Sequence, residues 1–221
     1  MLALSFDKVY ITGGVLFILL YAIIFHEVGH ALMAYWMGDP TAKNAGRISL
    51  NPIVHLDPFG SILVPIITYL VMKAPFGWAK PVPVNPFNYR HYVRGDILVS
   101  LAGVTANFLF AVVLGLLLHL ARPNSLNHTL LLTGVVVNSV LVFFNLLPIP
   151  PLDGSHIFQY LLPRRLRAQY MSIAPFGFFI LVILIIGLGR AFRGIDLFAP
   201  VGYIAKAALF LAGHGWVGSV W

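Results

Sequence analysis

Long stretches without any Asp, Glu, Lys or Arg constrain the fold of this chain more than any other feature. The clearest are Val9–Phe25, Ile97–Ala121, Thr129–Leu147 and Ser172–Gly189. A helix needs roughly 20 apolar residues to cross the hydrocarbon core of a bilayer, and these runs approach or exceed that length. Only 10% of the residues are charged, against roughly 25% in an average soluble domain. With a mean hydropathy of +0.89, the chain is expected to be an integral membrane protein.

Two weaker apolar segments decide how many helices cross the membrane. Residues 58–72 are uncharged but short and interrupted by Pro65, so they predict either a thin span or a re-entrant segment. Residues 200–213 are also short and contain Lys206. We therefore predict an all-α membrane protein, a polytopic bundle of five to six transmembrane helices. A small re-entrant or β segment is expected near residues 44–70.

The chain has 221 residues and shows no internal repeat, low-complexity tract or hydrophilic insertion of domain size. We expect a single transmembrane domain over 1–221, with a catalytic core at about 10–162 and accessory C-terminal spans at about 170–214. The formal charge of +7 comes from basic residues in loops beside apolar runs, where they favour lipid headgroups over nucleic acid. Their distribution leaves the membrane orientation open, because it depends on whether 58–72 crosses.

The strongest chemical signal is the sequence His26-Glu27-Val28-Gly29-His30 near the end of the first apolar run. Residues four apart share one face of a helix, so both imidazoles can reach one zinc ion at about 2.0–2.1 Å. Glu27 is displaced by roughly 100° around the helix and can hold water beside that ion. This H-E-x-x-H pattern is typical of zinc metalloproteases, in which the glutamate is the general base. Ionisable groups at membrane depth are costly unless they are paired or bind a metal.

Two histidines leave a catalytic zinc one protein ligand short. Asp153 is the best candidate, because it follows a span and a proline cluster in the sequence NLLPIPPLDG, residues 145–154. Prolines break the helix and Gly154 allows the backbone to turn, so the carboxylate can be directed at a metal. Helix capping is the alternative role of Asp153. His156 is a rival ligand that we rank below Asp153, as an outer or loop residue.

These motifs and their order resemble the site-2 protease family of intramembrane zinc metalloproteases. The segments LNPIVHLDPFG (50–60) and GWAKPVPVNP (77–86) are similar to the compact prokaryotic branch, which lacks PDZ and CBS domains. The resemblance implies one Zn²⁺ per chain, held by His26, His30 and Asp153, with Glu27 activating water. It also implies transmembrane protein or peptide substrates and a multi-pass location in a prokaryotic cell membrane. Regulation would then come from a separate membrane protein.

Two asparagines are candidates for binding the substrate or its developing oxyanion. The family usually carries Gly-x-x-x-Asn in a helix between the two metal motifs, and here Gly103 and Asn107 match it, with Val104 where proline is common. Asn145 opens the second motif. Either amide can hydrogen-bond substrate, or both can simply bond helix to helix. Residues 46–52 are the candidate edge strand for an extended substrate.

Two other functions remain in view at this point. A metal transporter would also place ligands within the membrane, but it gives Glu27 no particular role and usually shows paired repeats. A silent scaffold would be expected to lack the glutamate or a ligand, and all four residues are present. The sequence therefore favours an intramembrane zinc metalloendopeptidase.

Overall fold

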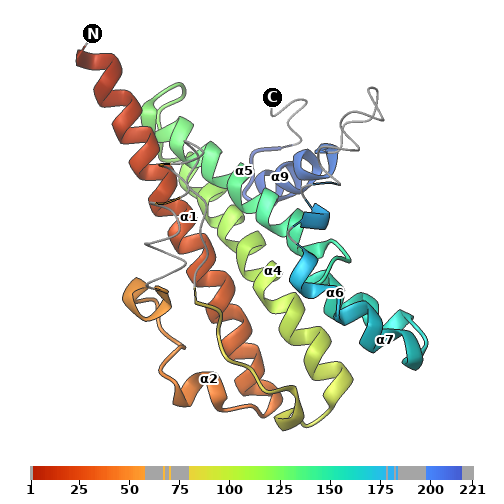
Figure 1. Cartoon of the computed structure of the whole chain (residues 1–221). Helices are drawn as coiled ribbons and strands as arrows, with labels where there is room; N and C mark the ends of the chain where they lie inside the picture. The colour runs from red at the N-terminus through yellow and green to blue at the C-terminus, as the bar shows by residue number, and fades with distance from the viewer. Residues whose placement is uncertain are drawn as a thin grey trace.

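The protein is a bundle of long helices packed side by side (Figure 1). The structure, a computed structural model, describes residues 2–57, 80–177 and 198–215, together with 67, 70, 179–181 and 183. Within those residues, three helices are long and apolar enough to cross a membrane: α1 (Leu2–Met37), α4 (Tyr92–Leu118) and α5 (Leu126–Leu146). The prediction of a helical membrane protein is confirmed. The expected span at 172–189 is described only in part, at 172–177, 179–181 and 183.

Helix α1 is 36 residues long and contains no proline. At 1.5 Å per residue it extends about 54 Å, well beyond the ~30 Å hydrocarbon core. It ends as predicted, because Gly38 adopts a positive φ of 110° that side chains disfavour. Asp39 N–H then bonds Ala34 O at 2.9 Å and closes the last turn. His26 and His30 lie about three and two turns before this end.

The main core lies where α1, α4, α5 and α9 (Ala199–Leu211) meet. Small residues allow the close approach, since Ala111, Ala205 and Ala208 are completely buried there. Large apolar residues on the outer faces, such as Leu16 and Phe17, are about 60% exposed (59% and 62%). In a membrane such side chains face lipid tails. Helix α9, from the weak segment at 200–213, is a shorter apolar helix packed on α4 and α5.

The connection between α1 and α4 leaves and returns at one end of the bundle. Arg90 N–H donates to Met37 O at 2.8 Å, and Lys80 N–H donates to His55 O at 3.0 Å. The segment 58–72, predicted to be a thin span or a re-entrant segment, lies between His55 and Lys80 in the sequence. Most of that segment lies outside the described residues.

The described part of the 44–70 region, residues 44–57, 67 and 70, contains no strand, so the expected edge strand at 46–52 is not formed. Two side chains explain this. Arg47 donates to the carbonyls of Val54, Lys80 and Pro81, and Asn51 Oδ1 accepts from Ile53 N–H to start a short 3-10 helix, η1 (Pro52–His55). Both interactions curl the backbone and occupy its polar groups. Helix α2 (Thr41–Asn44) precedes this turn, and η3 (Pro86–Asn88) precedes α4.

After α5 the chain turns back toward α4. The proline segment leads into α6 (Asp153–Phe158), then η4 (Gln159–Leu161), α7 (Arg164–Met171) and η5 (Ala174–Phe176). Helix α6 packs against both α4 and α5. The first residue of α6 therefore lies near the end of the bundle that also holds His26 and His30.

Candidate metal centre

Two helices that are far apart in sequence bring three potential ligands together. His26 and His30 come from α1 and Asp153 from the start of α6, and one ligand atom from each lies within 4.8 Å of the others. The two Nε2 atoms are 3.0 Å apart. Asp153 Oδ2 lies 3.3 Å from His26 Nε2, and Asp153 Oδ1 lies 3.4 Å from His30 Nε2. The residues expected to form the metal set are therefore adjacent.

These separations fit a zinc ion. Ligands at about 2.0–2.1 Å in a tetrahedral arrangement lie about 3.3 Å from one another. Asp153 Oδ2 is buried and accepts no hydrogen bond, although His26 Nε2 is close. A buried carboxylate oxygen without a partner is costly unless a cation supplies the interaction. The donor set of two imidazole nitrogens and one carboxylate oxygen is one that catalytic zinc uses, with a fourth position for water or substrate.

A backbone carbonyl of helix α4 orients the His30 ring through its Nδ1 atom. His30 Nδ1 lies 2.7 Å from Val99 O, and a carbonyl can only accept, so the proton is on Nδ1. This leaves the Nε2 lone pair directed toward Asp153 and His26. Gly103 gives the rings their space, because a Cβ there would lie 2.5 Å from His30 Nε2 and 2.7 Å from His26 Cε1. The Gly-x-x-x-Asn glycine is thus required by the site itself.

Gly154 acts through close packing rather than through an unusual turn. Its φ is not positive, and it is the second residue of α6. A Cβ at this position would overlap the carbonyl groups of Leu146 and Leu147 at the end of α5. Glycine therefore lets α6 sit against α5, which places Asp153 opposite α1.

Glu27 faces the same cavity as the three ligands. This cavity has a volume of about 340 Å³, and its lining includes His26, His30 and Asp153. Glu27 Oε2 accepts a hydrogen bond of 2.8 Å from Val82 N–H in the segment before α4. A backbone amide therefore orients the carboxylate, a contact that the side-chain sequence does not indicate.

The two candidate asparagines lie in different surroundings. Asn145 lines the cavity, and its Nδ2 donates to Leu141 O at 3.0 Å. Asn107 is 1% exposed and does not line the cavity. With its amide group oriented to donate, it bonds Ala22 O at 3.2 Å and Gly103 O at 3.3 Å. Asn107 therefore joins α4 to α1, whereas Asn145 borders the space that a substrate would fill.

A third carboxylate at the cavity, in addition to Glu27 and Asp153, was missed by sequence reasoning. Asp96, in the first turns of α4, is 6% exposed and lines the cavity together with His156. Its Oδ1 lies 3.3 Å from His156 Nδ1, and this bond raises the pKa of His156 above its ordinary value. His156 is not in the metal-binding group. The signal that could have indicated Asp96 is its position directly before the uncharged run Ile97–Ala121.

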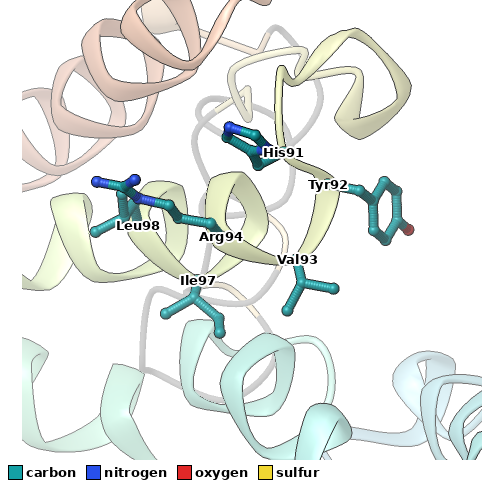
Figure 2. A pocket seen from close by; sticks show the side chains of 6 residues that line it. All are labelled: His91, Tyr92, Val93, Arg94, Ile97 and Leu98. Atoms are coloured by element: carbon teal, nitrogen blue, oxygen red, sulfur yellow. The ribbon is translucent and has the colours of Figure 1, made fainter.

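His55 is structural in the part of the chain that the structure describes. It is 2% exposed, its Nε2 lies 2.8 Å from Ser49 O, and it does not line the cavity. A larger hollow of about 630 Å³ lies at the start of α4, and Figure 2 shows its six lining residues, which are His91 and residues on the first turns of that helix. It has one histidine and no carboxylate, so it lacks a metal-binding donor set. The lining residues are His91, Tyr92, Val93, Arg94, Ile97 and Leu98.

Comparisons with known proteins point the same way as the geometry. The model of "Peptidase family M50" matches residues 119–187, which include Asp153 but not α1. "Putative zinc metalloprotease YwhC" of Bacillus subtilis is 38% identical over 177 residues, covering 76% of this chain and 78% of its own length. "Putative zinc metalloprotease Rip2" of Mycolicibacterium smegmatis is 33% identical over 177 residues, covering 76% and 64%. "Putative zinc metalloprotease MJ0611" of Methanocaldococcus jannaschii is 30% identical over 97 residues, covering 43% and 51%. No solved structure gave a significant match.

Proposed function

Because the chain belongs to peptidase family M50, we propose that His26, His30 and Asp153 are the zinc ligands of an intramembrane metalloprotease and that Glu27 is its general base. The family relationship makes the protein a zinc metalloprotease with substrates in the membrane. The proposal adds the residues that perform the reaction. The observation that carries it is the convergence of two imidazole nitrogens and a carboxylate oxygen beside Glu27, inside a bundle of membrane helices.

The fit of the ligand set assigns a specific task to each residue. Zinc held by the three side chains would make water more acidic and stabilise negative charge on a substrate carbonyl oxygen. Glu27 takes a proton from the attacking water and returns it to the leaving amine nitrogen. Val82 N–H holds Glu27 Oε2 at 2.8 Å and so limits the rotation of the carboxylate. Asn145 supplies an amide beside the scissile bond.

The depth of the site indicates which bonds are cleaved. His26 and His30 lie about 16 and 10 Å along α1 from its end at Met37, at 1.5 Å per residue. The substrate bond therefore lies inside the bilayer, nearer to one surface. A helical substrate hides its carbonyls in hydrogen bonds, so the segment entering the cavity must unwind.

Basic residues support a cytoplasmic position for this end of the bundle. The end that carries the site has eight described Lys or Arg residues in its loops, its short helices and the first turn of α4, whereas Arg122 and Lys8 lie toward the opposite end. Short cytoplasmic loops are enriched in such residues. We accordingly propose a multi-pass protein of a prokaryotic cell membrane with its site open toward the cytoplasm. The eight residues are Lys43, Arg47, Lys80, Arg90, Arg94, Arg164, Arg165 and Arg167.

The domain organisation follows from the packing of α9. Its Ala205, Ala208 and Leu209 join the buried cluster of α4 and α5. We therefore propose a single domain, with the catalytic core at 10–162 and an accessory C-terminal region at 170–214 that packs on it. A separate membrane protein would provide regulation.

The decisive experiment combines zinc analysis with cleavage of a transmembrane test peptide by the purified full chain in liposomes. Glu27→Gln is expected to retain one zinc per chain and to lose cleavage. Asp7→Asn is the matched control, because it neutralises an exposed carboxylate on the same helix, and it should behave as wild type. Cleavage retained by Glu27→Gln would refute the general-base role. Zinc uptake into sealed vesicles without cleavage would instead establish a transporter.

A further inference from the structure

We propose that His156 is a second catalytic residue, which donates a hydrogen bond from Nε2 to the carbonyl oxygen of the scissile bond, and that Asp96 is the residue that positions it. The inference rests on the proposed function, because it assigns a further role in the same cavity. It starts from a group of polar side chains that the metal centre leaves unexplained.

Asp96 collects three donors from the segment that follows Asp153. Its Oδ2 accepts from Tyr160 Oη at 2.8 Å and from Gln159 Nε2 at 3.0 Å, while Oδ1 faces His156 Nδ1 at 3.3 Å. The aspartate belongs to α4, and the three partners belong to α6 and η4. This arrangement uses both carboxylate oxygens and fixes the carboxylate in one orientation.

The pairing also supplies the charge that Asp96 needs. A carboxylate that is 6% exposed at the edge of a membrane helix requires a positively charged partner. In the part of the chain that the structure describes, no Lys or Arg forms an ion pair with Asp96, and His156 does. The fixed carboxylate therefore favours the protonated form of the imidazole, in which both ring nitrogens carry a proton.

Only one ring nitrogen of His156 is used by this pair. With Nδ1 directed at Asp96, the opposite ring edge carries Nε2, and the His156 side chain is 37% exposed and lines the metal cavity. The cavity wall therefore offers a substrate an oriented N–H group from α6, one turn beyond Asp153. An aspartate that orients a histidine whose other nitrogen faces substrate is an established catalytic arrangement.

The chemistry has a place for such a donor. When water attacks the scissile carbonyl, negative charge develops on the carbonyl oxygen, and a preorganised donor stabilises that charge more than it stabilises the ground state. His156 gives up no proton in this step, because Glu27 carries the proton from water to the leaving nitrogen. The contact should therefore act on kcat and hardly on KM.

If the Asp96–His156 contact only holds α6 against α4, a different result is expected. Loss of the contact would then lower stability and displace Asp153, so zinc content and thermal stability would fall together with activity. A donor that acts in the transition state changes kcat while zinc content stays constant. A cationic donor in place of the imidazole should then recover part of the rate.

The test uses the full-length, zinc-loaded protein in liposomes with a transmembrane test peptide. His156→Gln is expected to lower kcat by roughly 100-fold, in line with the loss of one oxyanion donor, with KM within about threefold and one zinc per chain. Asp96→Asn should lower kcat less, because the ring remains but is no longer fixed and charged. His156→Arg should exceed His156→Gln in kcat, and His91→Gln, an exposed histidine at the same end, serves as the matched control.

The outcomes separate this inference from the proposed function. If Glu27→Gln abolishes cleavage but His156→Gln leaves kcat unchanged, the inference fails while the protease assignment stands. Loss of zinc or of thermal stability in His156→Gln, matching the loss of rate, would also overturn it. Should His156→Gln fail to fold, equal kcat in Asp96→Asn and wild type would refute the positioning role. If wild-type cleavage does not depend on Glu27, both proposals fall.

Discussion

Two pairs of histidines, toward opposite ends of α4, differ in what their ring nitrogens face. His26 and His30 meet edge to face, with ring planes at 89° and Nε2 atoms 3.0 Å apart, next to the carboxylate of Asp153. His119 and His214 stack in parallel, with ring planes at 5° and centroids 4.0 Å apart. Each Nε2 of the second pair lies against a backbone carbonyl, Ala212 O at 2.8 Å and Gly115 O at 2.7 Å.

The difference shows that closeness of two imidazoles does not make a metal site. A carbonyl oxygen can only accept a hydrogen bond, so Nε2 of His119 and of His214 must carry hydrogen and has no lone pair for a metal. These residues join the C-terminal ends of α4 and α9. In the first pair, His30 Nδ1–H donates a hydrogen bond to the Val99 carbonyl, which leaves the lone pair on Nε2. Nε2 atoms bonded to carbonyls are typical of a structural pair, whereas Nε2 lone pairs directed toward a carboxylate are the arrangement that we propose binds zinc.

The largest expected effect tests this distinction directly. His26→Ala or Asp153→Ala should remove a ligand and weaken zinc binding by more than the roughly 10–100-fold that loss of an outer hydrogen-bond partner costs. His119→Ala should leave the zinc content unchanged. Zinc per chain, measured after dialysis against a weak chelator, provides the comparison, and cleavage should follow zinc occupancy. Equal zinc content in Asp153→Ala and wild type would transfer the third-ligand role to another residue.

The same comparison explains how far the sequence could predict this protein. The spacing of His26 and His30 was sufficient to predict that both lie on one face of a helix, and the uncharged runs were sufficient to predict the long helices, because both follow from helix geometry and bilayer thickness. Helix α4 begins at Tyr92, earlier than the predicted 97, because the Gln159, Tyr160 and His156 side chains satisfy Asp96. The charged residues Arg94 and Asp96 favour a helix start at Ile97 when the sequence is considered alone.

What the sequence could not predict are contacts made by backbone groups and by long-range neighbours. The Val82 amide on Glu27 leaves no trace in side-chain chemistry, since almost any residue carries the same N–H. The separation of Asn107 from Asn145 depends on which face of each helix is turned toward the cavity. Likewise, the sequence placed His156 near the site but gave no means of pairing it with Asp96.

A smaller effect on zinc affinity is expected when a side chain fills the space at Gly103 beside the rings of His26 and His30. A Cβ at Gly103 would lie 2.5 Å from His30 Nε2, whereas a Cβ at Gly13 meets nothing within 4 Å. Gly103→Ala should therefore displace the rings and reduce zinc affinity by about 10-fold, as other losses of ligand orientation do. Gly13→Ala, on the same metal helix α1, is the control and should be neutral. Unchanged zinc affinity in Gly103→Ala would mean that the rings do not need their present positions.

The stacked pair should respond in stability and not in metal content. His214→Ala leaves the Gly115 carbonyl without its donor and removes the ring that covers His119. An unsatisfied buried acceptor costs about 1–3 kcal/mol, so the thermal midpoint should fall while zinc per chain stays the same. Zinc loss in this variant without a fall in thermal midpoint would contradict the structural role. Thermal unfolding of the chain in detergent, with zinc analysis on the same samples, measures both.

Two carboxylates, Asp39 and Asp153, differ in the same way as the two histidine pairs. Replacing Asp39 is expected to have the smallest effect of the substitutions considered. Asp39, just beyond α1, is fully buried and accepts from Asn85 N at 2.6 Å, Asn88 Nδ2 at 2.8 Å and Thr41 N at 3.1 Å. Burial alone would raise the pKa of Asp39, but these bonds together outweigh it and hold the pKa below its usual value. Asp153, by comparison, keeps an oxygen without a hydrogen bond.

Replacing Asp39 should consequently change stability in a pH-dependent way and leave zinc binding intact. Because the folded-state pKa is lowered, the ionised carboxylate stabilises the fold at pH above the unfolded pKa of about 3.9. That contribution disappears as the pH falls through the lower, folded-state pKa. Asp39→Asn should therefore be less stable than wild type by about 1 kcal/mol at pH 7, and the difference should shrink on acidification below pH 4. Melting curves of the metal-free protein from pH 7 to pH 3 test this, and a constant difference over that range would show that Asp39 acts through shape and not through charge.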